Sequence, residues 1–435
     1  MKEKISAYLF SLLPNSPTKK RLYENFISLS LLRGITYLFP LFTLPYLVRV
    51  LGPEKYGLVA FAQAFANYFN ILTDYGFNMS ATREISIERE DKNKVSQIFS
   101  SVLSIKFLLF IFSLIIFTTI VFFIPRFAAD KAVYFFSFLL VLGNTLFPIW
   151  FFQGMEKMKY ITFISTLAKV FFLICVFVFI KRPDQYALVP LFGSLGSLIS
   201  GLVALILVFK SFKIKFIIPS LKEMKTQLIS GWHFFTASFF TTIYTSSNTF
   251  FIGLVTGNNE LVGYFAGAEK IVAAFRGLLS PISQTVYPYF SKLFYESKEK
   301  SLEILKKMGL IIGSFSLAIS IIMFVLAPFI SRVVLGEEFS ASTPLIRIMS
   351  FVPFIISLSN IFAIQGLLGL GKSKTVSKII ALASIVHLPV FVLLTLFFSI
   401  QGAATAIVIT ESLITGLSIY NFNKTCNTKK RLFSL

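Results

Sequence analysis

The chain has 435 residues, of which 55% are hydrophobic, 16% are aromatic and only 14% are charged. A soluble domain carries about a quarter charged residues, and a soluble protein this apolar would expose large apolar patches, so the composition excludes an ordinary soluble fold and indicates that lipid surrounds the chain. The formal net charge of +21 does not indicate a nucleic-acid partner, because the basic residues fall in short clusters between apolar stretches, as in the loops of membrane proteins.

Several long apolar stretches follow one another along the chain. A bilayer core about 30 Å thick requires about 20 such residues per helix. The predicted spans are residues 25–44, 57–79, 101–124, 132–153, 161–180, 187–209, 228–256, 262–290, 308–331, 342–369, 376–398 and 403–421. Strands are not expected, because an open sheet edge cannot face lipid. The sequence therefore predicts an all-α integral membrane protein of about 12 transmembrane helices.

The distribution of basic residues predicts how these helices are oriented. If the N-terminus is cytoplasmic, the predicted cytoplasmic segments hold about four times as many Lys and Arg residues as the outer segments, as the positive-inside rule requires. Both termini of this multi-pass protein are therefore expected in the cytoplasm.

A faint internal repeat divides the chain. It aligns Glu54 with Glu260 and Gly57 with Gly263, and both copies lie in predicted outer loops, so the repeat is parallel. We therefore expect two six-helix bundles. The predicted segments are a cytoplasmic N-terminal segment (1–24), an N-terminal bundle (25–209), a cytoplasmic linker (210–227), a C-terminal bundle (228–421) and a cytoplasmic tail (422–435).

Charged residues inside the predicted spans are the candidate functional residues, because an ionisable group at bilayer depth costs about 2.5–3.5 kcal/mol on insertion scales and normally faces water or a partner. The basic ones assigned to a cationic, substrate-binding cavity are Arg33, Lys169, Arg276, Arg347 and Lys270. The acidic ones, assigned to ion coupling or charge balance, are Asp74, Glu269 and Glu411. An excess of cations suits an anionic substrate, since a desolvated guanidinium gains most from a phosphate.

Local explanations remain open for these charges and for the polar residues near them. Lys106 and Asp74 lie near helix ends and can snorkel to the interface, and Glu269 could simply neutralise Lys270 or Arg276. The polar residues that could line the cavity are Gln63, Asn67, Asn70, Asn144, Asn248, Gln284 and Gln365. Hydrogen bonds between helices are the alternative role for each of them.

The sequence contains no convincing catalytic or cofactor-binding motif. Residues 366–373 match the phosphate-loop pattern G-x-x-x-x-G-K-[ST], but they end a predicted membrane helix and follow no strand, so no nucleotide is expected. His233 and His387 are the only histidines and stand far apart, and each is interpreted as a packed or cavity-lining residue. With two separate cysteines, Cys175 and Cys426, the chain predicts no metal site, no cofactor and no enzyme.

Three segments carry a resemblance to a known family. They are residues 40–57 (PLFTLPYLVRVLGPEKYG), residues 74–86 (DYGFNMSATREIS) and residues 150–156 (WFFQGME). The first resembles the first outer loop of Wzx-type polysaccharide repeat-unit flippases, and the second resembles their first cytoplasmic loop. The similarity covers the whole chain and is most specific in residues 37–86.

The resemblance implies both a fold and a function. The fold would be two six-helix bundles around a central cavity, shared with MATE-like multidrug exporters and the lipid II flippase. The substrate would be an undecaprenyl-pyrophosphate-linked oligosaccharide of the O-antigen or capsule type, moved from the inner to the outer leaflet of a bacterial inner membrane by alternating access coupled to H⁺ or Na⁺. By position, Arg33 and Arg276 fit the cationic role. The alternatives are another MATE-like exporter, for lipid II or for drugs and cations, and a polyprenyl-linked membrane enzyme.

Overall fold

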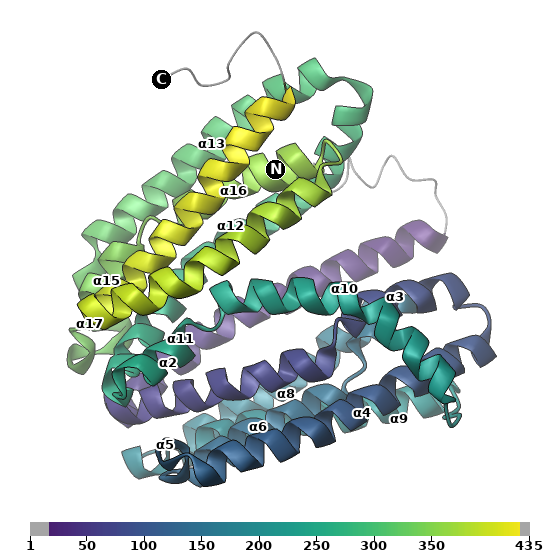
Figure 1. The fold of residues 1–435 in the computed structure, drawn as a ribbon, viewed down its shortest axis with the longest axis horizontal. Coiled ribbons are helices and arrows are strands. Elements are labelled where there is room, and N and C mark those ends of the chain that lie inside the picture. The colour runs from purple at the N-terminus through teal and green to yellow at the C-terminus, as the bar shows by residue number, and fades with distance from the viewer. Residues whose placement is uncertain (1–16, 427–435) are drawn as a thin grey trace. The chain divides into compact units, whose positions relative to one another are not determined.

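The computed structural model describes the chain from residue 17 to residue 426, without the side chains of residues 17–38, 41, 243, 278–289, 291, 292, 295, 296, 298 and 300. In this range the regular elements are helices and no strand is found, which confirms the predicted all-α class (Figure 1). The helices form two compact units. Unit 1 holds the described residues up to Phe39, Phe65–Lys181 and Gln185–Ser238, and unit 2 holds Pro40–Ala64, Arg182–Asp184 and the described residues from Phe239 onward. The division of the chain into two bundles joined by a cytoplasmic linker at residues 210–227 stays a prediction.

Unit 1 is an aromatic-rich helical bundle. It contains both ends of α2 (Pro17–Asp74), then α3 (Phe77–Glu88), α4 (Lys92–Phe123), α5 (Pro125–Ala128), α6 (Lys131–Leu146), α7 (Ile149–Gly154), α8 (Met158–Phe179), α9 (Leu188–Lys210) and most of α10 (Leu221–Thr245). The 3₁₀ turn η1 (Pro183–Gln185), between α8 and α9, belongs to unit 2 except for Gln185. Its core includes Phe77, Phe99, Trp150 and Phe151, all fully buried. Large rings are used here because each one removes much surface from its surroundings at little conformational cost.

Unit 2 contains the middle of α2 and the C-terminal half of the chain. Its elements are the end of α10, α11 (Asn248–Thr256), α12 (Asn259–Glu296), α13 (Lys298–Val325), α14 (Ala327–Ile330), the π-helical η2 (Ser331–Leu335), the 3₁₀ turn η3 (Glu337–Phe339), α15 (Ser342–Met349), α16 (Val352–Ser359), the π-helical η4 (Asn360–Leu368) and α17 (Ser373–Cys426). Phe290, Leu305, Leu367 and Phe422 lie in its core.

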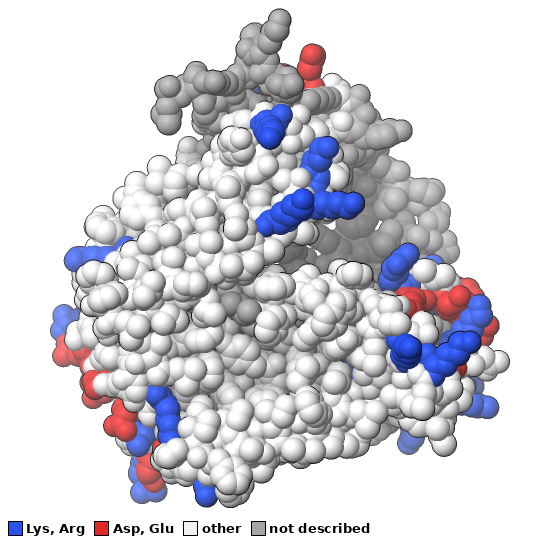
Figure 2. Space-filling model, viewed as in Figure 1, with Lys and Arg blue, Asp and Glu red and all other residues white. Residues whose placement is uncertain are grey.

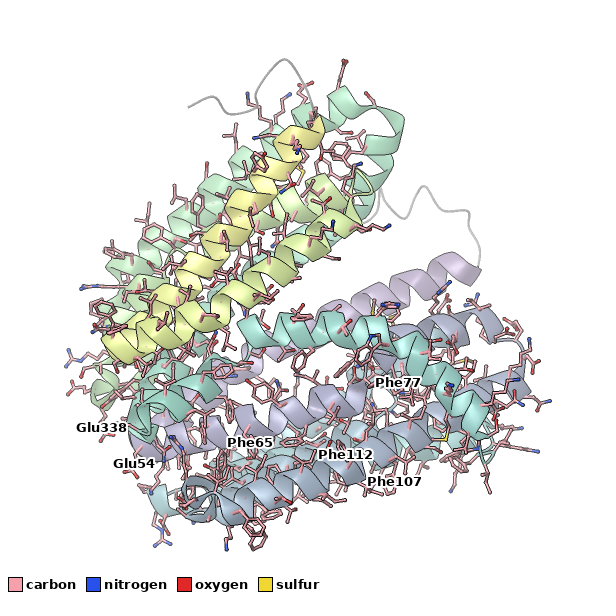
Figure 3. All side chains as sticks on the ribbon, viewed as in Figure 1. Glu54, Phe65, Phe77, Phe107, Phe112 and Glu338 are labelled. Atoms are coloured by element: carbon pink, nitrogen blue, oxygen red, sulfur yellow. The ribbon has the colours of Figure 1, made fainter. Side chains whose placement is uncertain are left out.

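The surface of unit 1 suits an apolar solvent. On α4, Phe107 is 47% exposed and Phe112 is 54% exposed, whereas Phe65 and Phe77 are buried inside the unit (Figure 3). Figure 2 shows the visible charged side chains of this unit toward the ends of its helices, with an uncharged surface between them. Such exposed rings would be a liability in water and are ordinary in lipid.

Seven helices in the described part of the chain are long and apolar enough to cross a membrane, which makes this a multi-pass membrane protein. The predicted number of 12 is not confirmed, partly because two pairs of predicted spans are joined. Spans 25–44 and 57–79 are joined in α2, which bends at Gly52 (φ 68°, ψ 173°). Spans 376–398 and 403–421 are joined in α17, which is interrupted at Ser399 (φ 53°, ψ −142°).

Several predicted spans are divided rather than continuous, among them residues 228–256 and 342–369. Residues 228–256 break between α10 and α11, where the Ser247 hydroxyl donates a hydrogen bond to the Thr242 carbonyl at 3.1 Å in competition with the helical pattern. Residues 342–369 break into α15, α16 and η4, and Pro353, which has no amide donor, lies in the first turn of α16. An apolar run sets the length of a span but not the continuity of its helix.

The internal repeat corresponds to a close crossing of α2 and α12 in unit 2. A Cβ atom on Gly57 would lie 1.8 Å from the Asn259 carbonyl oxygen, and a Cβ on Gly263 would lie 2.0 Å from the Pro53 carbonyl oxygen. The two contacts are reciprocal, because Pro53 aligns with Asn259 as Gly57 aligns with Gly263. Only glycine lets the two backbones approach so closely.

Two of the segments that carry the family resemblance pack together in unit 1. The Thr82 hydroxyl on α3 lies 3.2 Å from the carbonyl oxygen of Trp150 and 3.3 Å from Gln153 Oε1, both on α7. A Cβ on Gly154 would lie 2.6 Å from the Ile85 side chain. Residues 74–86 and 150–156, which both carry the family resemblance, therefore belong to the same tertiary contact.

Candidate functional site

A polar network, here called the Asp74 cluster, joins four helices of unit 1. Lys106 Nζ on α4 lies 3.6 Å from Asp74 Oδ1 at the end of α2 and 3.5 Å from the Asn144 carbonyl oxygen on α6. The Asn144 amide donates to Asn70 Oδ1 at 3.0 Å, and Ser197 on α9 donates to Asn144 Oδ1 at 2.9 Å. Two of the predicted cavity residues, Asn70 and Asn144, thus meet Asp74, which was predicted for ion coupling or charge balance.

Lys106 does not extend to the membrane interface, as the snorkelling explanation would require. Its residue is only 3% exposed, so its ammonium group is held inside the unit rather than extended to an interface. A buried ammonium needs a countercharge, and Asp74 supplies one. Of the two roles predicted for Asp74, the geometry favours charge balance.

We expect Asp74→Asn to destabilise the protein by about 2–3 kcal/mol, because it leaves the Lys106 ammonium buried without a countercharge. The effect falls below that of a fully buried pair, because the Asp74 side chain is 32% exposed. The measurement is the thermal unfolding midpoint in detergent. Glu303→Gln is the matched control, since its ion pair with Lys307 on α13 is exposed and contributes little. Equal midpoints for the two variants would contradict the assignment.

A second network, the His387 cluster, lies in unit 2 and joins α11, α12 and both halves of α17. The buried ring of His387 places Nε2 2.9 Å from Asn248 Oδ1 and Nδ1 2.7 Å from Thr410 Oγ1. The Asn248 side chain also hydrogen-bonds Glu269 on α12, and the Thr249 hydroxyl donates to Glu269 Oε2 at 3.2 Å. The cluster is continuous from Glu269 to Thr410.

Arg276 stands on the same helix as Glu269 and remains available to a ligand. Its side chain is exposed, and within the described residues it forms no ion pair or hydrogen bond. Its charge still interacts at longer range with Glu269 and with Glu411 on α17. The structure therefore places one accessible guanidinium beside two acidic residues of unit 2.

The remaining predicted residues are spread over both units. Lys169 is half-buried on α8, Lys270 is exposed on α12, and Arg347 is exposed at the end of α15, where its guanidinium lies 5.9 Å from the centroid of the Phe324 ring. Gln63 is exposed, Asn67 is half-buried and Gln365 is buried in η4. The side chains of Arg33 and Gln284 lie outside the described residues. The structure therefore brings together only part of the predicted set within each unit.

The sequence does not reveal which side chains His387 contacts. Sequence reasoning treats both histidines as isolated, since no second ligand or acid is close in sequence. The partner that Nε2 contacts is 139 residues away, and the Nδ1 partner is 23 residues away beyond the break in α17. The nearest usable signal was that Asn248, Glu269, His387 and Thr410 all fall inside predicted spans.

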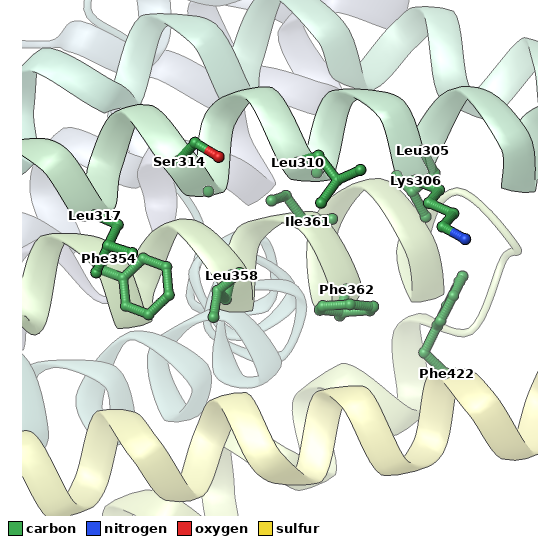
Figure 4. A pocket seen from close by; sticks show the side chains of 12 residues that line it. Leu305, Lys306, Leu310, Ser314, Leu317, Phe354, Leu358, Ile361, Phe362 and Phe422 are labelled. Carbon is green, nitrogen blue, oxygen red and sulfur yellow. The ribbon is translucent and has the colours of Figure 1, made fainter. Parts of the chain in front are cut away.

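A groove on unit 2 has a different character. It has a volume of about 240 Å³ and runs between α13, α16, η4 and the end of α17 (Figure 4). Leu310, Leu317, Phe354 and Phe362 contribute to its wall, and Lys306 stands at one end. A lining this apolar suits a lipid chain and does not suit a sugar or a phosphate group.

Comparison with known proteins gives a family. The sequence model of a protein family described as polysaccharide biosynthesis protein matches residues 22–294. An Escherichia coli (strain K12) protein named "Putative O-antigen transporter" is 34% identical over 406 residues, which are 92% of this chain and 96% of that protein. A Shigella dysenteriae protein with the same name is 33% identical over 399 residues, covering 90% of this chain and 97% of that protein.

Comparison with solved structures gives the fold. A multidrug-resistance MATE family transporter of the MOP superfamily, in its inward-facing conformation, matches with a TM-score of 0.68 at 13% identity and covers 89% of this chain and 94% of that one. The lipid II flippase MurJ in an inward closed conformation matches with a TM-score of 0.66 at 13% identity, covering 92% and 87%. At these identities the likeness shows a shared fold and no shared substrate.

Proposed function

The chain belongs to the polysaccharide biosynthesis protein family, and from that premise we propose that it moves undecaprenyl-pyrophosphate-linked oligosaccharide repeat units, of the O-antigen or capsule type, from the inner to the outer leaflet of a bacterial inner membrane. The observation that carries the proposal is the 34% identity, across 92% of the chain, to the Escherichia coli protein named "Putative O-antigen transporter". The chain is a membrane transporter and not an enzyme, and it shares its fold with a MATE family transporter and with MurJ.

The charges in unit 2 support an anionic headgroup as the transported part. Arg276 presents an exposed guanidinium with no partner among the described residues, and a guanidinium matches two oxygens of a pyrophosphate with parallel hydrogen bonds. Arg33, Lys169, Lys270 and Arg347 are proposed as further members of this cationic set. Asp74, Glu269 and Glu411 would balance the charge or couple it to an ion.

The proposed mechanism is alternating access. The headgroup would bind between two helical bundles that open in turn to the cytoplasmic and outer leaflets, while the polyprenyl tail stays in lipid. A gradient of H⁺ or Na⁺ would drive the cycle. The apolar groove along α13 is not suited to the headgroup, so the charged residues and not this groove would bind the part that crosses.

Reconstitution tests the proposal directly. Purified protein in sealed vesicles is given a defined undecaprenyl-pyrophosphate-linked oligosaccharide, and the share of the sugar that a lectin can reach on the far side is measured. We expect protein-dependent translocation of this lipid and little of lipid II or of a cationic drug. Translocation of lipid II or the drug, with none of the oligosaccharide lipid, would overturn the proposal in favour of the other MATE-like exporters.

A further inference from the structure

The His387 cluster contains a titratable ring that is fixed at both nitrogens. His387 is 1% exposed, and its two ring nitrogens form hydrogen bonds with side chains from α11 and from the second half of α17. Neither partner, Asn248 or Thr410, is itself ionisable. A buried imidazole needs no such pair of partners for packing alone, since a hydrophobic residue of that size would fill the space without desolvating two polar atoms.

The direction of each hydrogen bond follows from the inventory of donors. Asn248 Oδ1 faces His387 Nε2 at 2.9 Å, which leaves the Asn248 amide group for the hydrogen bond to the Glu269 carboxyl group. Oδ1 only accepts, so His387 Nε2 must carry a hydrogen. The neutral ring is therefore the Nε2–H tautomer, and its Nδ1 is a free lone pair directed at Thr410.

Thr410 can satisfy this nitrogen with or without a proton. Its Oγ1 lies 2.7 Å from His387 Nδ1 and 2.8 Å from the Ala406 carbonyl oxygen. When Nδ1 is bare, the hydroxyl donates to it. When Nδ1 is protonated, it donates to Oγ1 and the hydroxyl rotates to donate to Ala406. Every polar atom is satisfied in both states and no heavy atom has to move.

We propose that His387 Nδ1 is the binding site of a coupling proton, held by Asn248 and Thr410 and exchanged for the lipid-linked substrate in each transport cycle. The inference rests on the proposed function and adds to it the identity and place of the coupling ion. One proton would enter from the outer side, reside on Nδ1 and leave to the cytoplasm as one substrate moves outward.

The charged surroundings fit this role. On α12, Glu269 is joined to the ring through Asn248, and Arg276 lies within electrostatic reach of Glu269 and of Glu411. On α10, the Tyr244 ring lies edge-on with its centroid 6.5 Å from that of His387. The packed segments α16 and η4 carry no ionisable side chain, and Arg347 of α15 is engaged with Phe324. Substrate at Arg276 would therefore alter the field at the proton site.

The buried state of His387 also fits an exchanged ion. At 1% exposure the ring cannot trade protons with water in this conformation. Proton uptake and release would require other conformations of unit 2, which is how a coupled carrier avoids leakage.

The first test needs no substrate. With two histidines in the chain, protein labelled with ¹⁵N-histidine and embedded in nanodiscs yields signals from only two rings, and a His233→Gln variant leaves one. We expect the remaining His387 ring to be the Nε2–H tautomer at high pH and to gain a proton at Nδ1 as the pH is lowered within the range in which the protein stays folded. An Nδ1–H tautomer at high pH, or a ring that never titrates, would overturn the proposal.

The second test measures coupling in the reconstituted vesicles. If one proton is exchanged per lipid, each unit of pH difference shifts the steady-state ratio of substrate between leaflets by about tenfold. We expect that shift in the wild type and in His233→Gln and Thr410→Ser, and its loss in His387→Gln and Thr410→Val. A full shift in His387→Gln, or a wild type driven by a sodium gradient at equal pH, would contradict the proton site.

The two proposals fail in different ways. If the wild type moves no oligosaccharide lipid under any gradient, the proposed function fails, while the ¹⁵N titration still decides whether His387 is a proton site. If the wild type moves the lipid but responds to pH as His387→Gln does, the function stands and the coupling site is wrong.

Discussion

Alanine at Gly263 or at Gly57 is expected to destabilise the protein by about 3 kcal/mol and to abolish transport. The new Cβ would lie 2.0 Å from the Pro53 carbonyl oxygen in the first variant and 1.8 Å from the Asn259 carbonyl oxygen in the second. Each obstacle is backbone, so no rotamer change relieves the overlap, and α2 and α12 must move apart. The measurements are the thermal unfolding midpoint in detergent and translocation in vesicles.

The matched control is Gly416→Ala on α17. A Cβ at that helical position meets nothing within 4 Å, so alanine should leave stability unchanged or raise it by about 0.5–1 kcal/mol through its better helix propensity. If the Gly57 and Gly263 variants match this control in midpoint and in transport, the close crossing of α2 and α12 is not part of the working structure.

Arg276→Ala is expected to lower oligosaccharide-lipid translocation by about ten- to a hundredfold without changing the unfolding midpoint. The loss corresponds to about 1.5–3 kcal/mol for charge-assisted hydrogen bonds to an anionic headgroup. Stability should be unaffected, since the exposed side chain forms no ion pair or hydrogen bond with any described residue. The measurement is initial rate against substrate concentration in vesicles, together with the midpoint.

Two variants make that result specific. Arg276→Lys keeps the charge but not the two-pronged geometry, so it should recover only part of the rate. Arg332→Ala removes an equally charged and exposed arginine, whose partner is Glu337, and should transport normally. Full transport by Arg276→Ala, or an equal loss in Arg332→Ala, would remove Arg276 from the substrate site.

The helical architecture could be predicted because each membrane helix carries its own signal in hydropathy. Span 161–180 lies close to the helix Met158–Phe179, and span 132–153 lies close to the stretch Lys131–Gly154, which α6 and α7 share. Whether each helix is continuous is harder to predict, because a side-chain hydrogen bond at Ser247 and a proline at residue 353 interrupt helices without changing the hydropathy of the apolar run. The repeat was visible through paired glycines, but the sequence did not reveal that those glycines contact each other.

The candidate site was only partly predictable, because hydropathy fixes a helix but not its rotation about its own axis. Asp74, Asn70 and Asn144 were all selected as polar residues in apolar spans, yet nothing in the sequence pairs them with Lys106. The sequence predicts His387 only as a packed or cavity-lining residue, because its partners lie on α11 and beyond the break in α17. Contacts across long chain separations depend on tertiary packing that a single sequence does not display.

The break in α17 at Ser399 reverses the chain, and its position places His387 and Thr410 opposite each other. His387 lies 12 residues before Ser399 and Thr410 lies 11 residues after it, so the two residues are at nearly equal distances along the chain from the break. Gly402 and Leu394 touch close to the reversal. Each residue turns a helix by about 100°. Removing one residue here would bring the carboxylate of Glu411 to the place of the Thr410 hydroxyl, so this turn should tolerate substitutions far better than changes of length.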